Sequence, residues 1–178
     1  MINIDAHNHV RGKSIYLDDI QELQGTLYAL PFDATVAHAK IKSLNLEAAL
    51  HRKGIVTILT AKDILGENQI GGILPDEPLF ADGEVHFRGQ VIALIIGTSE
   101  HHCRQAAKLI EVVYEELPVI TDAREAQKQD KLIIPPRSFK LGNTSEAWSQ
   151  CDHIFEGRTD VNGQEHLYIE TQGAYARP

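Results

Sequence analysis

The sequence lacks the features that mark several common classes of protein. It has only two cysteines among 178 residues, Cys103 and Cys151, and their wide separation does not indicate a disulfide framework. The longest apolar run, residues 91–96, is far shorter than the roughly 20 residues of a membrane helix. No secretory leader pattern opens the chain. We therefore expect a cytoplasmic protein with free thiols and no membrane contact.

Positive charge is also scarce. The chain has 17 Lys and Arg against 25 Asp and Glu, which gives a formal net charge of −8. No basic run extends beyond Arg52 and Lys53, so a nucleic-acid partner is not expected, because phosphate binding needs a basic face. Glycine-rich phosphate loops and CxxC pairs are absent as well, so the sequence predicts no nucleotide or iron–sulfur site of its own.

The clearest local pattern is a strand followed by a helix. Residues 90–97 are almost all apolar, which predicts a strand buried on both faces. Ser99 is a suitable residue to begin a helix, and Cys103, Ala106 and Ile110 recur at helical spacing after it. With several shorter strands around this pair, the sequence predicts an α+β fold.

The chain divides into three stretches by composition. Residues 1–121 contain a polar arm and the α+β domain, and residues 122–150 form a connector with two adjacent prolines. In residues 151–178 two strands are predicted, 152–161 and 167–174. Two strands alone are marginal in water, so we expect this last stretch to be the incomplete start of a second domain.

Two histidine motifs suggest metal sites. His7 and His9 would lie on the same face if they occupied a strand, as in the first strand of amidohydrolase barrels. Such a barrel needs about 250 residues and further ligands, so a polar arm is the favoured interpretation and a metal hydrolase the less favoured one. His101, His102 and Cys103 point in different directions on a helix. We therefore assign no metal ligand.

A third motif is GQEH at residues 163–166, between the last two predicted strands. Gln164 is uncharged and carries both a donor and an acceptor, so it could orient an oxo or hydroxo ligand without titrating. By spacing alone, a simple polar turn is the favoured interpretation.

Several segments, taken in order, resemble the xanthine dehydrogenase and aldehyde oxidase family. The resemblance extends from about His9 to the end of the chain. The segments that carry it are residues 9–12, 17–20, 37–41, 76–81, 89–96, 112–118 and 163–172.

This resemblance implies an α/β hammerhead domain, a mixed sheet with a few helices, up to about residue 121. The start of the molybdopterin-binding domain would follow it. It also implies that Gln164 lies beside the oxo ligand of the molybdenum. Asn162 stands where the family usually has Gly, and because Asn tolerates a positive φ the turn is expected to survive. Leu167 stands where the family usually has Phe, which leaves the substrate class open. The family's catalytic Glu lies far downstream, so no catalytic residue is assigned here.

The function expected from the resemblance is that of a molybdenum hydroxylase of purine catabolism. Such an enzyme hydroxylates purines or similar heterocycles with oxygen from water and passes electrons to iron–sulfur clusters, FAD and NAD. This stretch would be mainly scaffold, with no cofactor held tightly by itself. Its expected partners are the rest of its own chain, iron–sulfur and FAD domains or subunits, and a second copy of the whole enzyme. The alternative is a non-catalytic module that docks subunits or assists assembly.

Overall fold

The computed structural model describes residues 6–167, 170 and 172–177. It divides into two units, one of residues Leu23–Lys131 and one that combines Met1–Glu22 with Leu132–Pro178. None of the described helices is both long and apolar enough to cross a membrane. The elements in chain order are α1 (Ala6–His9), η1 (Leu17–Asp19), β1 (Tyr28–Asp33), β2 (Ala39–Asn45), α2 (Glu47–Leu50), β3 (Ile55–Thr60), η2 (Ala61–Asp63), β4 (Glu84–Val85), β5 (Val91–Gly97), α3 (Glu100–Ala107), β6 (Glu111–Glu116), α4 (Ala123–Lys128) and α5 (Thr144–Ser149).

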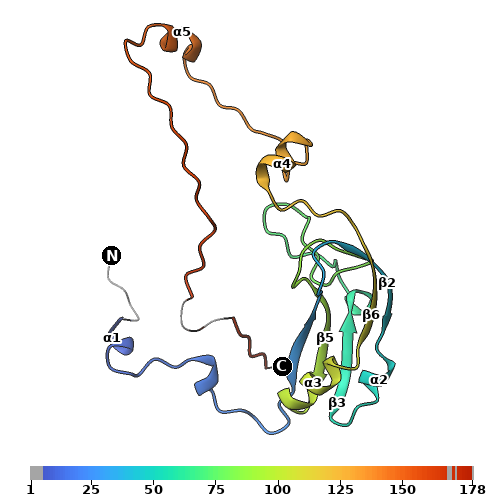
Figure 1. Cartoon of the computed structure of the whole chain (residues 1–178). Coiled ribbons are helices and arrows are strands. Elements are labelled where there is room, and N and C mark those ends of the chain that lie inside the picture. Colours follow the sequence, from blue (N-terminus) through green and yellow to red (C-terminus); the bar gives the residue numbers. More distant parts are fainter. Residues whose placement is uncertain (1–5, 168–169, 171, 178) are drawn as a thin grey trace. The chain divides into compact units, whose positions relative to one another are not determined.

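The strands of the Leu23–Lys131 unit form two three-stranded sheets (Figure 1). One has the order β1-β5-β3 and the other β4-β2-β6, and every pairing in both is antiparallel. The α+β class is confirmed, but two antiparallel sheets replace the mixed sheet expected from the sequence. A helix that connects two strands of the same sheet usually makes them parallel neighbours. Here α3 connects β5 in one sheet to β6 in the other, so the two strands do not pair.

Strand β5 is the centre of the fold. Ala93 and Ile95 are fully buried in a cluster with residues of α3, while Ile92 is buried in a second cluster with residues of β2 and β4. The strand therefore has a core on each side, as its continuous apolar run predicts.

Helix α3 follows the predicted pattern. The Ser99 hydroxyl accepts a hydrogen bond from the backbone N–H of His102 at 3.2 Å, which satisfies a donor that the first turn leaves unpaired. Cys103 and Ala106 are fully buried on the face that packs against β1 and β5. Burial raises the pKa of the Cys103 thiol, so it stays protonated and serves as a small core residue.

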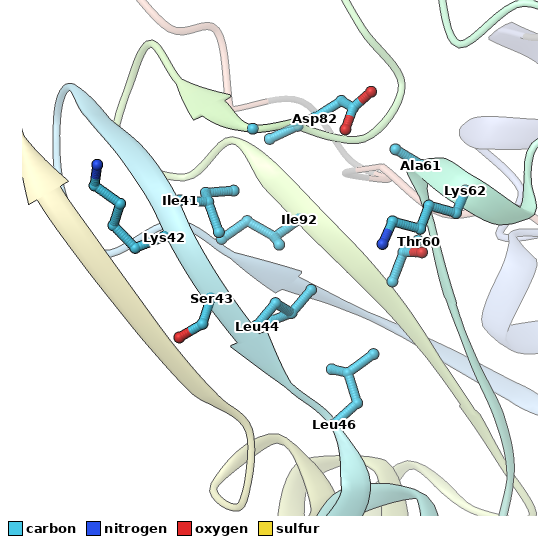
Figure 2. Close-up of a pocket in the computed structure, with 12 residues that line it drawn as sticks. Ile41, Lys42, Ser43, Leu44, Leu46, Thr60, Ala61, Lys62, Asp82 and Ile92 are labelled. Carbon is cyan, nitrogen blue, oxygen red and sulfur yellow. The ribbon is translucent and has the colours of Figure 1, made fainter.

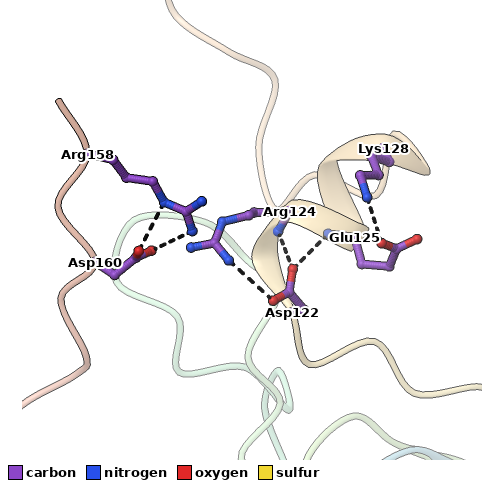
Figure 3. A network of polar contacts seen from close by, with 6 residues as sticks. All are labelled: Asp122, Arg124, Glu125, Lys128, Arg158 and Asp160. Atoms are coloured by element: carbon purple, nitrogen blue, oxygen red, sulfur yellow. Dashed lines mark hydrogen bonds and ion pairs between the residues drawn. The ribbon is translucent and has the colours of Figure 1, made fainter. Parts of the chain in front are cut away.

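Helix α4 is a surface helix near the start of the connector. Asp122 caps it by accepting hydrogen bonds from the backbone N–H groups of Arg124 at 2.9 Å and Glu125 at 3.0 Å (Figure 3). In the other unit, the guanidinium of Arg158 pairs with the carboxylate of Asp160 at 3.0 Å. The Arg124–Asp122 and Arg158–Asp160 ion pairs are both exposed to solvent, so we expect each to add little stability.

The strand predicted at residues 152–161 does not form. In the described part of residues 151–178 the chain is irregular and contains no strand. The second prediction, residues 167–174, includes positions outside the described residues, and its described positions carry no strand either. The physical reason is pairing: β-forming side chains specify a strand only when another strand accepts its hydrogen bonds, and no such partner lies among the described residues.

Candidate cofactor-contacting segment

The GQEH motif lies in an exposed segment without regular secondary structure. The Glu165 carboxylate accepts hydrogen bonds from the backbone N–H groups of His166 at 2.9 Å and Leu167 at 3.4 Å. Leu167 has a positive φ of 47°, which is unusual for a residue other than glycine and marks a sharp change of direction. Hydrogen bonds within the segment therefore help to set its local conformation.

Gln164 is exposed in this segment, and its side-chain amide makes no hydrogen bond to any residue that the structure describes. An amide in this position can donate to and accept from an external group without changing charge. It is thus suited to a polar oxygen ligand of a bound cofactor, and Gln164 remains our candidate for that role.

The N-terminal arm contacts the chain just beyond the motif. The backbone N–H of Leu17 donates to both carboxylate oxygens of Glu170, each at 2.8 Å. A side-chain carbon at Gly173 would come within 2.5 Å of Cδ2 of Leu17, so glycine permits a close approach there. The N-terminal arm is therefore in contact with residues that follow Gln164 in the sequence.

The HxH interpretation of His7 and His9 loses its geometric basis. Both residues lie on α1, a helix, where residues two apart point in nearly opposite directions. His9 instead shares a hydrogen bond of 2.6 Å with the Ser14 hydroxyl, and its ring stacks at 6.5 Å from that of Tyr16. The strand-based hydrolase hypothesis is therefore wrong in its structural premise.

The structure also separates the three side chains of His101, His102 and Cys103, which lie in different environments. His101 is exposed and Cys103 lies in the core, while Nδ1 of the half-buried His102 is 3.0 Å from the Thr98 hydroxyl. Cys103 is a core residue, as predicted.

A pocket of about 440 Å³ lies between β2 and the junction of β3 with η2 (Figure 2). Its floor is apolar, with Ile41, Leu44 and Ile92, and polar side chains such as Lys62 and Asp82 lie at its edge. The described residues that line it include neither histidine nor cysteine. We assign this pocket no catalytic role.

Sequence reasoning missed a cluster of His38, Glu84 and His86. Nε2 of His38 is 2.9 Å from Oε1 of Glu84, and Nδ1 of His86 is 3.7 Å from the same oxygen. The hydrogen bond to the Pro118 carbonyl and the bond to Glu84 raise the pKa of His38. The bond from His38 lowers the pKa of Glu84. The only sequence signal is the spacing of 84 and 86, which places both side chains on one face of a strand.

Comparison with known proteins defines the class of this fold. Residues 11–118 match the family model described as "Aldehyde oxidase and xanthine dehydrogenase, a/b hammerhead domain", and residues 125–178 match "Molybdopterin cofactor-binding domain". The fold is also similar to aldehyde oxidoreductase from Desulfovibrio gigas, with a TM-score of 0.71 and 30% identity over 84% of this chain and 19% of that one. Another similar structure is the carbon monoxide dehydrogenase of Oligotropha carboxidovorans, with a TM-score of 0.62 and 30% identity over 71% of this chain and 16% of that one.

The chain belongs to the aldehyde oxidase and xanthine dehydrogenase family, which confirms the resemblance seen in its sequence. It is 36% identical over 178 residues to xanthine dehydrogenase/oxidase of Gallus gallus, covering 100% of this chain and 13% of the relative. It is equally 36% identical over 180 residues to aldehyde oxidase 1 of Bos taurus, again covering 100% of this chain and 13% of the relative. The chain thus spans about an eighth of the length of these relatives.

Proposed function

We propose that this chain is the hammerhead domain and the beginning of the molybdenum-cofactor-binding region of a hydroxylase. The observation that carries the proposal is the order of the two family matches, residues 11–118 and then 125–178. The complete enzyme would hydroxylate purines or related heterocycles with oxygen from water. Equal identity to a xanthine dehydrogenase/oxidase and an aldehyde oxidase leaves aldehydes as the competing substrate class.

In this proposal the Leu23–Lys131 unit is a scaffold and Gln164 contacts the cofactor. The molybdenum cofactor, when bound, supplies an oxygen atom that originates from water and accepts two electrons from the substrate. The neutral amide of Gln164 orients a polar ligand and stabilises charge that develops on it. The exposed position of Gln164 and its lack of a hydrogen-bond partner among the described residues support this role.

The domain organisation proposed for the chain has three parts. They are an arm and hammerhead domain in residues 1–121, a connector in residues 122–150, and the incomplete molybdopterin-binding domain in residues 151–178. The proposed partners are the rest of the same polypeptide, iron–sulfur and FAD domains or subunits that pass electrons to NAD, and a second copy in a dimer. Free Cys103 and Cys151 support a reducing location such as the cytoplasm.

Isotope labelling tests the proposed reaction. The complete enzyme is incubated in water enriched in oxygen-18 with xanthine, and in parallel with an aromatic aldehyde, using NAD as the electron acceptor. We expect the hydroxylated product to carry one labelled oxygen, because water is the proposed source. Incorporation from labelled dioxygen instead, or no oxidation of either substrate, would contradict the proposal. The ratio of the two rates also decides the substrate class.

A further inference from the structure

His38, Glu84 and His86 form a cluster in the Leu23–Lys131 unit that has no part in the role proposed for Gln164. Their ligand atoms all lie within 4.8 Å of one another. The two imidazole rings are 5.9 Å apart between centroids and tilted by 31°. Both histidines and the carboxylate are at least partly open to solvent, so a dissolved ion can reach them.

The register of two strands assembles this cluster. In the antiparallel pairing of β2 with β4, Ala39 lies opposite Val85. Continuing this register by one residue places His38 opposite His86, and Glu84 shares the face of His86 because side chains alternate along a strand. Ala39 and Val85 are fully buried on the other face, which fixes the outward direction of the three polar side chains.

The hydrogen bonds of His38 prepare its Nε2 to bind a cation. Nδ1 is 2.9 Å from the Pro118 carbonyl oxygen. A carbonyl only accepts, so Nδ1 carries a hydrogen. Nε2 donates to Glu84, and its lone pair becomes available when a cation displaces that proton. A histidine held through its other nitrogen by a backbone carbonyl is the usual arrangement for a metal ligand.

His86 is also held in place. Its backbone N–H donates at 2.7 Å to Oε1 of Gln90, a side chain that is only 4% exposed. The backbone of His86 is thus fixed to the core, while its imidazole is 57% exposed. Two of the three candidate ligands are therefore positioned by contacts that do not use their metal-binding atoms.

We propose that His38, Glu84 and His86 bind a divalent ion of the zinc type. Two imidazole nitrogens and one carboxylate oxygen are a donor set that zinc accepts, and three protein ligands leave a fourth position for water. Ligand atoms around a tetrahedral zinc are about 3.3 Å apart, given metal–ligand distances of about 2.0 Å. The observed separations of 2.9 Å and 3.7 Å lie on either side of that value, so only small side-chain movements are needed. Lys40 lies opposite Glu84, and its charge opposes a cation, so we expect moderate affinity.

Calorimetric titration with zinc chloride tests this site. The 178-residue chain is freed of any affinity tag, treated with a chelator and titrated near neutral pH. We expect one ion per chain with a dissociation constant in the micromolar range. His86→Ala and Glu84→Gln should each weaken binding by at least about tenfold, the loss that even outer contacts of a metal ligand can cause. His86 is exposed, so its replacement should leave the fold intact.

His101→Ala is the matched control, because His101 is an exposed histidine outside the cluster. It should bind zinc as the unmodified chain does, and Lys40→Gln should bind more tightly because a repelling charge is removed. Absence of saturable zinc binding by the unmodified chain would overturn the proposal. The same holds if the His86→Ala and Glu84→Gln variants bind zinc as tightly as the unmodified chain. Because this readout is independent of molybdenum and of turnover, it does not depend on the proposed hydroxylase function.

Discussion

Replacing Gln164 by alanine in the complete enzyme should lower kcat by about a hundredfold, the usual loss when one group that stabilises developing charge is removed. The methyl group of alanine can neither donate to nor accept from an oxygen ligand. Gln164 is exposed and contributes no hydrogen bond to the described part of the chain, so the fold should survive the change. Steady-state kinetics with the preferred substrate, together with circular dichroism, measure both effects.

The control for this experiment is Gln150→Ala. Gln150 is also an exposed glutamine, at the end of α5 and outside the GQEH motif, so its replacement should leave kcat unchanged. Molybdenum content should be measured for both variants, since loss of the metal alone would also reduce the rate. If Gln164→Ala has the turnover of the unmodified enzyme, Gln164 does not act on the cofactor.

The largest expected effect on stability comes from Ile95→Ala. Ile95 is fully buried in the centre of β5, so its truncation removes apolar contacts and leaves a cavity between the sheet and α3. Such a change typically lowers the free energy of unfolding by about 2–5 kcal/mol. Urea unfolding of the 178-residue chain, followed by circular dichroism, gives the difference.

Ile73→Ala is the matched control, because Ile73 is 96% exposed and has little packing to lose. We expect its effect on the free energy of unfolding to be within about 0.5 kcal/mol of zero. Equal stability of the Ile95 and Ile73 variants would mean that β5 is not the centre of the core.

The best-predicted parts of the fold are those with local patterns. The unbroken apolar run of β5 predicts a strand buried on both faces. The helical spacing of Cys103 and Ala106 predicts the buried face of α3. The division into two sheets was not predicted, because it depends on which distant strands pair. The strand predicted at residues 152–161 illustrates the same limit. Its side chains favour a strand, but no partner strand lies among the residues that the structure describes.

The candidate sites show the limit more sharply. Gln164 became a candidate only because its motif resembles a known family, since spacing alone favoured a simple turn. His38 and Glu84 are 46 residues apart, and only the register of β2 with β4 brings them together. A pattern search along the chain favours close pairs such as His7 and His9, whereas cross-strand clusters appear only in three dimensions.

Molybdenum and pterin analysis of two purified proteins tests the central claim, that these residues are scaffold plus one contact to a cofactor held by a larger enzyme. The complete protein and the 178-residue chain are produced in the same cells and analysed by elemental analysis and by pterin fluorescence. We predict nearly one molybdenum and one pterin per complete protein and neither in the short chain. A short chain that retains a stoichiometric cofactor would contradict the claim, as would a complete protein that contains none.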